Sequence, residues 1–162
     1  MATQTYDLIS STTLSSAVQT VTLNSIPSSY RDLVLVMTAA ATGTSYYGIY
    51  LNNNSSSVYD VVSVESNGSA QAANAYTSTR IYPSYSYNGV NTTPHLSIWQ
   101  FLDYSRTDKH KIVLQRGNTG SLHLNMLAAK YASTSAISRI DIECGSQNWA
   151  AGSTFYLYGI EA

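Results

Sequence analysis

The sequence predicts an all-β protein, an antiparallel two-sheet β-sandwich of jelly-roll-like type that forms a single domain over residues 1–162. Three observations predict this class. About ten short segments are rich in β-favouring residues with period-2 spacing, turn-forming Gly, Asn and Ser separate them, and no segment has convincing helical periodicity. The nearest helical alternative is a short helix over residues 122–130. A chain of 162 residues can bury one self-sufficient core.

In the first half of the chain, strands are predicted at residues 5–10, 18–23, 32–40, 45–51 and 58–65, with a shorter one at 76–82. The segment 32–40 is apolar on both faces, which is typical of a central strand. The turn at 41–44 predicts a hairpin between that strand and the next one. Residues 66–74, rich in Gly, Ala and Ser, are predicted to form a flexible connection, and residues 83–94 a long loop that carries tyrosines.

The second half is more regular, with strands predicted at residues 95–103, 109–116, 121–129, 138–143 and 154–160. Turn-forming residues separate them at 104–108, 117–120, 130–135 and 145–152. In the last strand, Phe155 and Leu157 alternate with Tyr156 and Tyr158, so both faces are suited to burial. We therefore expect the last strand to be interior, and we expect the same of the first strand because Leu8 and Ile9 point to opposite faces.

Only 10% of the residues are charged and the net charge is −1, while the chain contains 14 tyrosines. The sequence therefore has no basic footprint for nucleic acid and no polybasic segment for a membrane surface. A net charge near zero favours self-association. A single cysteine, Cys144, excludes an intrachain disulfide and is expected to be a small buried residue. With no signal peptide and no long apolar run, we expect synthesis in a cytoplasm.

The candidate catalytic and metal-binding residues are histidines and carboxylates. His110 and His123 flank the turn at 117–120 and could approach each other across a hairpin, but no acidic or cysteine cluster accompanies them or His95. Asp141 and Glu143 share one strand face beside Arg139, which is typical of a solvated surface. The sequence therefore predicts no enzyme, no catalytic residue, no cofactor and no metal site.

The tyrosines are the most suggestive candidates for binding, because a tyrosine offers a large contact area and a polar tip. The candidate interface residues are Tyr46, Tyr47, Tyr50, Tyr82, Tyr85 and Tyr87. They are expected either to stack on sugar rings or to form a protein interface, and some of them to face the core instead.

Four stretches carry a family resemblance: residues 6–14 (YDLISSTTL), 21–27 (VTLNSIP), 30–36 (YRDLVLV) and 151–160 (AGSTFYLYGI). In these stretches the chain resembles a group of small virion proteins of tailed bacteriophages. The resemblance covers the two ends of the chain and leaves the middle unmatched. It implies a β-sandwich structural protein of the phage particle, and we know of no catalytic motif in that group.

The resemblance and the composition together favour a capsid decoration (cement) protein, which binds the capsid surface and reinforces contacts between subunits. The implied partners are the major capsid protein and other copies of this chain, expected as a homotrimer because capsid lattices offer local threefold positions. The implied location is the virion, after synthesis in the bacterial host. The alternative is a protein of the tail, neck or fibre that binds a carbohydrate receptor, in which case a glycan is a partner.

Overall fold

The computed structural model describes residues 5–83, 89–119 and 123–161, and over these residues the chain forms strands and no helix. The strands are β1 (Tyr6–Thr13), β2 (Thr20–Leu23), β3 (Asp32–Ala39), β4 (Gly48–Leu51), β5 (Tyr59–Ser66), β6 (Gln71–Ser78), β7 (His95–Leu102), β8 (Lys111–Thr119), β9 (His123–Tyr131), β10 (Ile140–Glu143) and β11 (Thr154–Ile160).

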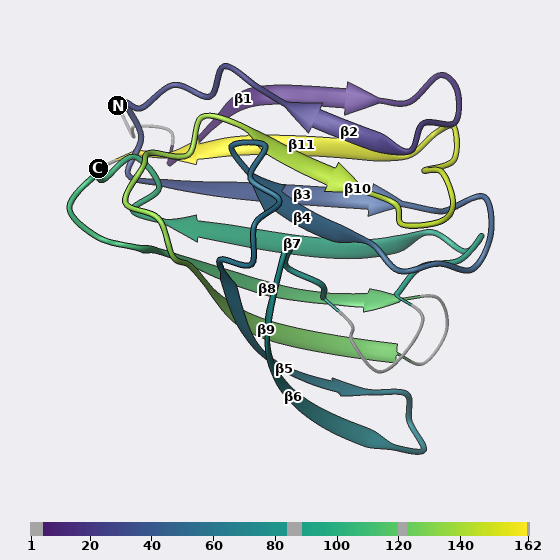
Figure 1. Cartoon of the computed structure of the whole chain (residues 1–162). Coiled ribbons are helices and arrows are strands. Elements are labelled where there is room, and N and C mark those ends of the chain that lie inside the picture. Colours follow the sequence, from purple (N-terminus) through teal and green to yellow (C-terminus); the bar gives the residue numbers. More distant parts are fainter. Residues whose placement is uncertain (1–4, 84–88, 120–122, 162) are drawn as a thin grey trace.

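The strands form two antiparallel sheets (Figure 1). The wide sheet has eight strands in the order β1-β11-β3-β7-β8-β9-β5-β6, and the narrow sheet has three in the order β2-β10-β4. Between them lies a core to which Leu35, Trp99 and Phe155 contribute from the wide sheet and Ile49 and Ile142 from the narrow sheet. The predicted all-β, jelly-roll-like sandwich is therefore confirmed.

The last strand is interior, as predicted, because β11 pairs with β1 on one side and β3 on the other. The prediction that the first strand is interior was wrong. β1 is an edge strand of the wide sheet, and Leu8 is 55% exposed while Ile9 packs partly against the core. The two-sided apolar pattern of residues 6–9 thus reflects a half-covered edge strand rather than a central one.

Two local predictions were also wrong, and one alternative is excluded. The expected hairpin between 32–40 and 45–51 does not form, because β4 joins the narrow sheet and pairs with β10. The stretch 66–74, expected to be flexible, contains the start of β6, which pairs with β5 in register over its full length. The helical alternative at 122–130 is excluded for residues 123–130, since β9 alternates buried and exposed side chains as a strand does.

The narrow sheet covers only part of the wide sheet. Figure 1 shows it in front of β11, β3 and β7, whereas β5 and β6 extend beyond it. Beyond the edge of the narrow sheet, isolated β-bridges join Ile81 to Ile49 and Val90 to Ser45. These bridges tie the described parts of the 79–94 segment to the narrow-sheet region. In the described part of the chain, no further layer of strands lies on the opposite face of the wide sheet. That face, together with the outer surface of the narrow sheet, is available for binding.

Candidate functional site

The first candidate surface is the face of the wide sheet that points away from the core. Side chains alternate between the two faces of a strand, so in each strand the exposed set is the one that points outward. On β5, β7, β8 and β9 the outward set is largely apolar. We call the following side chains, which are 36% to 66% exposed, the outer apolar face: Val62, Val64, Leu96, Ile112, Leu114, Leu124 and Met126.

Backbone pairing places these side chains in rows across the sheet. In one row, Val64 lies opposite Ala73 of β6 and opposite Met126 of β9, and Met126 lies opposite Arg116 of β8. Directly opposed residues on one face have their Cβ atoms about 4.5–5.5 Å apart, which is close enough for contact. The apolar side chains therefore form one continuous patch over neighbouring strands.

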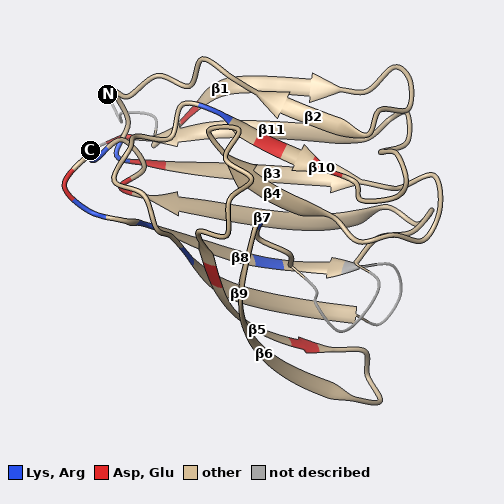
Figure 2. Cartoon of the chain, viewed as in Figure 1, with Lys and Arg blue, Asp and Glu red and all other residues tan. Residues whose placement is uncertain are grey.

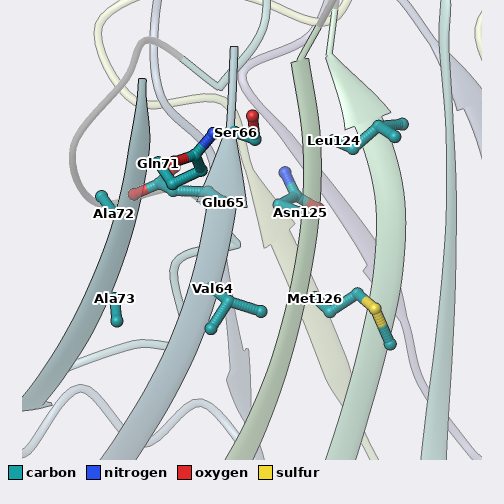
Figure 3. Close-up of a pocket in the computed structure, with 9 residues that line it drawn as sticks. All are labelled: Val64, Glu65, Ser66, Gln71, Ala72, Ala73, Leu124, Asn125 and Met126. Atoms are coloured by element: carbon teal, nitrogen blue, oxygen red, sulfur yellow. The ribbon is translucent and has the colours of Figure 1, made fainter. Parts of the chain in front are cut away.

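The patch is grooved rather than flat. Figure 3 shows Met126 on one side of Val64 and the small Ala73 side chain of β6 on the other. The groove lined by these residues has a volume of about 510 Å³. A second groove of about 420 Å³ lies on the other side of Leu124 and Met126, against Leu96 of β7. The two β9 side chains thus stand as a ridge between two apolar grooves.

Charge is scarce on this half of the sheet. Figure 2 shows several of the charged residues gathered at the end of the sandwich where the termini lie. Within the patch, Asp60 and Lys130 lie directly opposite each other and form an ion pair of 2.5 Å, which lowers the pKa of the Asp60 carboxyl. Arg116 is the other charged side chain on the outward positions of β5 to β9. The surface is therefore suited to a protein partner rather than to a charged ligand.

The second candidate surface lies over the narrow sheet, around Arg80. Its guanidinium forms an ion pair of 2.8 Å with Glu143 and lies 5.6 Å and 5.9 Å from the ring centres of Tyr50 and Tyr82. Such cation–π contacts hold the rings and the guanidinium together. A Cβ on Gly48 would come within 2.6 Å of the Arg80 side chain, so the glycine leaves the space that Arg80 occupies.

Tyr46 completes this surface, since its ring meets the Tyr82 ring edge-to-face at 5.5 Å and is 47% exposed. Burial raises the pKa of Tyr50 and Tyr82, and the carboxylates of Asp141 and Glu143 raise that of Tyr50 further. Both phenols therefore stay neutral at physiological pH and can donate and accept hydrogen bonds. We call Tyr46, Tyr50, Arg80, Tyr82 and Glu143 the tyrosine–arginine surface.

The structure therefore brings together Tyr46, Tyr50 and Tyr82 of the predicted tyrosine interface. The prediction that Tyr47 is an interface residue was wrong, because its side chain is 1% exposed and packs against His95, Trp99 and Trp149 in the core. It faces inward because β-structure alternates sides, and its neighbour Tyr46 takes the outward position. Tyr85 and Tyr87 lie outside the described residues.

His110 lies at one end of the β7–β8–β9 part of the sheet, and His95 and His123 lie at the other end. His110 is exposed and precedes β8, whereas His123 pairs with Thr119 at the other end of the β8–β9 hairpin, about 30 Å along the strands. The predicted approach of His110 to His123 was therefore wrong. His123 contacts Glu65 at 3.2 Å, and His95 is buried, which lowers its pKa to about 4. Among the described residues, no group of three His, Cys, Asp or Glu side chains is arranged to hold a metal ion.

The interior beneath β7, β8 and β9 contains a polar network that the sequence analysis missed. Gln115 donates to Ser97 at 3.0 Å and to Asn125 at 2.7 Å, and the Tyr47 hydroxyl donates to Ser97 at 3.0 Å. All four residues are at most 4% exposed. Ser97, Gln115 and Asn125 lie at inward positions of their strands, so their place in the alternation was the sequence feature that could have indicated burial.

The paired carboxylates of β10 differ from the prediction. Asp141 was expected on a solvated strand face, but its side chain is fully buried and accepts hydrogen bonds from Arg139 and Thr22. Glu143 is half-buried and paired with Arg80. Each carboxylate is thus held by its own arginine. Cys144 is buried as predicted, and burial raises its thiol pKa to about 12.

No family model matches the chain, and no curated protein matches it. Among solved structures, the chain is similar to galectin LEC-6 of Caenorhabditis elegans, with 12% identity over 100% of this chain and 99% of that chain and a TM-score of 0.40. It is also similar to a mutant alginate lyase Aly36B in complex with an alginate tetrasaccharide, with 10% identity over 93% of this chain and 80% of that chain and a TM-score of 0.36. Likeness at this level assigns no residue of either surface. Within the described ranges, the chain has no helix long and apolar enough to cross a membrane.

Proposed function

We propose that this chain is a non-enzymatic structural protein of a bacteriophage particle, acting as a capsid decoration protein. The observation that carries the proposal is the outer apolar face, with seven exposed apolar side chains on four neighbouring strands. Continuous exposed patches of this kind are typical of protein interaction sites. The resemblance of the two chain ends to phage virion proteins supplies the kind of assembly in which that site would be covered.

The free energy of covering the outer apolar face favours binding within an assembly of many copies over binding of one isolated pair. Covering the exposed part of the seven side chains is worth about 1 kcal/mol each, or about 7 kcal/mol together. Association costs about 4–15 kcal/mol in lost freedom. The outer apolar face alone therefore sustains modest affinity, and a capsid lattice would raise it by holding copies of this chain close together.

A second contact surface fits the same proposal. The tyrosine–arginine surface lies over the narrow sheet, on the side of the sandwich opposite the outer apolar face. Tyrosine and arginine are enriched at the energetically important centres of protein interfaces. A protein with binding surfaces on both sides can hold two neighbours together, which is what a cement protein does.

The test is binding to undecorated shells assembled from the major capsid protein. We expect the chain to co-sediment with the shells and to raise the temperature at which they fall apart. The double change Tyr46→Ser/Tyr82→Ser should weaken co-sedimentation, whereas Tyr6→Ser, which is equally exposed on β1, should not. A chain that ignores shells and binds isolated tails would refute capsid decoration.

The carbohydrate-binding alternative is favoured by one observation, the exposed Tyr46 ring beside Tyr82, Arg80 and Glu143. Aromatic rings next to hydrogen-bonding groups are suited to sugar rings. Binding to a defined glycan on an array, lost in Tyr46→Ser/Tyr82→Ser and retained in Tyr6→Ser, would support this alternative. Stable attachment to glycan-free shells without array binding would oppose it.

A further inference from the structure

We propose that the outer apolar face is a contact surface between two copies of this chain, packed face to face about a two-fold axis that passes beside the ridge of Leu124 and Met126. This two-fold contact takes the place of the homotrimer expected from the sequence. The proposal rests on the proposed function and deepens it, because it names the partner at the face that carries that function. The charge, the area and the relief of the face all favour a second copy as its partner.

The charge of the face restricts what can cover it. On the outward positions of β5 to β9, Asp60 and Lys130 neutralise each other, and Arg116, which lies opposite Met126 and lines the groove toward β7, is the remaining charge. A partner that placed further charges against Val64 or Met126 would bury them without a counter-ion, which is costly. The same face of a second copy brings a single charge of this kind, its own Arg116, and the long Arg116 side chains can reach water between the two copies.

The area of the face fits a dimer contact. Strands lie about 4.8 Å apart and rise about 3.4 Å per residue, so the five strands from β7 to β6 present a surface of about 24 Å by 25 Å, or about 600 Å² in projection. Corrugated side chains expose more than this flat area. A standard interface takes about 800 Å² from each partner. A contact centred on β9, the middle strand of these five, therefore approaches the size of a stable interface.

The relief of the face is self-complementary. Leu124 and Met126 form a ridge with an apolar groove on each side, of about 510 Å³ toward β6 and about 420 Å³ toward β7. In a two-fold contact, the ridge of each copy enters a groove of the other, so that one pair of complementary features is used twice. Figure 3 shows the small Ala73 side chain at the wall of the first groove, where it leaves room for such a ridge.

The first experiment is sedimentation velocity of the whole chain. We expect the mass of two 17.6 kDa chains for the parent protein and of one chain for Met126→Asp at the same concentration. The matched control is Leu8→Asp, which changes a side chain of similar exposure on the same sheet face, about 24 Å away on edge strand β1. It should remain a dimer. Near-ultraviolet circular dichroism of all three proteins checks that each is folded.

The second experiment is disulfide cross-linking. Because Cys144 is buried, a single introduced cysteine is the one that reacts. We expect oxidation to join two copies of Met126→Cys and not two copies of Leu8→Cys. A parent chain that is monomeric, or a Met126→Asp variant that stays dimeric and folded, would overturn the inference.

These outcomes are separable from those of the proposed function. A dimer that Met126→Asp disrupts, but that ignores capsid shells, supports this inference and refutes capsid decoration. A monomer whose shell binding is lost in Met126→Asp refutes this inference, because the face then contacts the capsid protein instead.

Discussion

The change Asp141→Asn tests whether β10 carries a buried ion pair or an exposed one. The Asp141 carboxylate is fully buried and accepts hydrogen bonds from Arg139 at 2.8 to 3.0 Å and from the Thr22 hydroxyl at 2.7 Å. The amide of asparagine has no charge and places a donor where an oxygen faced the Arg139 Nε. At least one charge-assisted hydrogen bond is therefore lost.

A hydrogen bond to a charged group is worth about 1.5–3 kcal/mol. The Arg139 side chain is 40% exposed and can turn to water, so we take the lower part of this range, about 2 kcal/mol. For a chain of this size the melting temperature should fall by about 4–8 °C. Urea titration followed by tryptophan fluorescence measures the free energy of unfolding.

The matched control is Asp60→Asn, which removes the acid of the exposed ion pair with Lys130. Its side chain is 46% exposed, so water can replace the lost contact and the unfolding midpoint should not change measurably. Equal midpoints for Asp141→Asn and Asp60→Asn would refute the assignment of a buried, stabilising carboxylate.

Three further predictions concern the core and the chain end. Burial lowers the pKa of His95 from 6.5 to about 4. Between pH 6.5 and pH 4 the unfolded chain therefore binds more protons than the folded chain. The free energy of unfolding should fall by about 3 kcal/mol as the pH decreases through this range. Urea titrations at pH 7 and pH 4 should show this loss reduced in His95→Phe. Gly159→Ala should cost about 1–3 kcal/mol, because its Cβ would lie 2.3 Å from the Tyr30 ring, and a double-mutant cycle with Tyr30→Ala should recover part of the loss. Deleting residues 155–162 removes the strand between β1 and β3 and should leave an insoluble product, which a soluble, cooperatively unfolding truncation would contradict.

The sequence predicted the fold class and most strands because period-2 patterns in β-favouring residues report local structure directly. It placed a short strand at 76–82 and missed residues 71–75 of β6, where Ala and Asn have low β propensity. That part of the strand forms because β5 supplies a complete row of backbone partners. The predicted hairpin of β3 with β4 was wrong because β4 pairs with β10, and a partner so far away in the chain leaves no mark on the local pattern.

The site was predicted less well than the fold, because exposure depends on the partner layer. Tyr46 and Tyr47 are adjacent tyrosines with equal propensity, yet one is 47% exposed and the other 1%. Asp141 was expected in solvent because a single strand cannot show that Thr22 and Arg139 enclose it. Alternation indicates that two sets of side chains face opposite ways, and the second layer decides which set is buried.

The outer apolar face corresponds to a pattern that is visible in the sequence. The segments that became β5, β8 and β9 have apolar residues at outward positions as well as inward ones, for example Val62 beside Val61 and Leu114 beside Val113. A strand that is apolar on both faces is typical of a sheet covered on both sides. The narrow sheet and the segment beside it that carries Ile81 and Val90 cover one face, and in the described residues no strand or helix covers the other. The sequence is therefore suited to a three-layer environment of which a single chain provides two layers, and the face-to-face dimer supplies the third from a second copy.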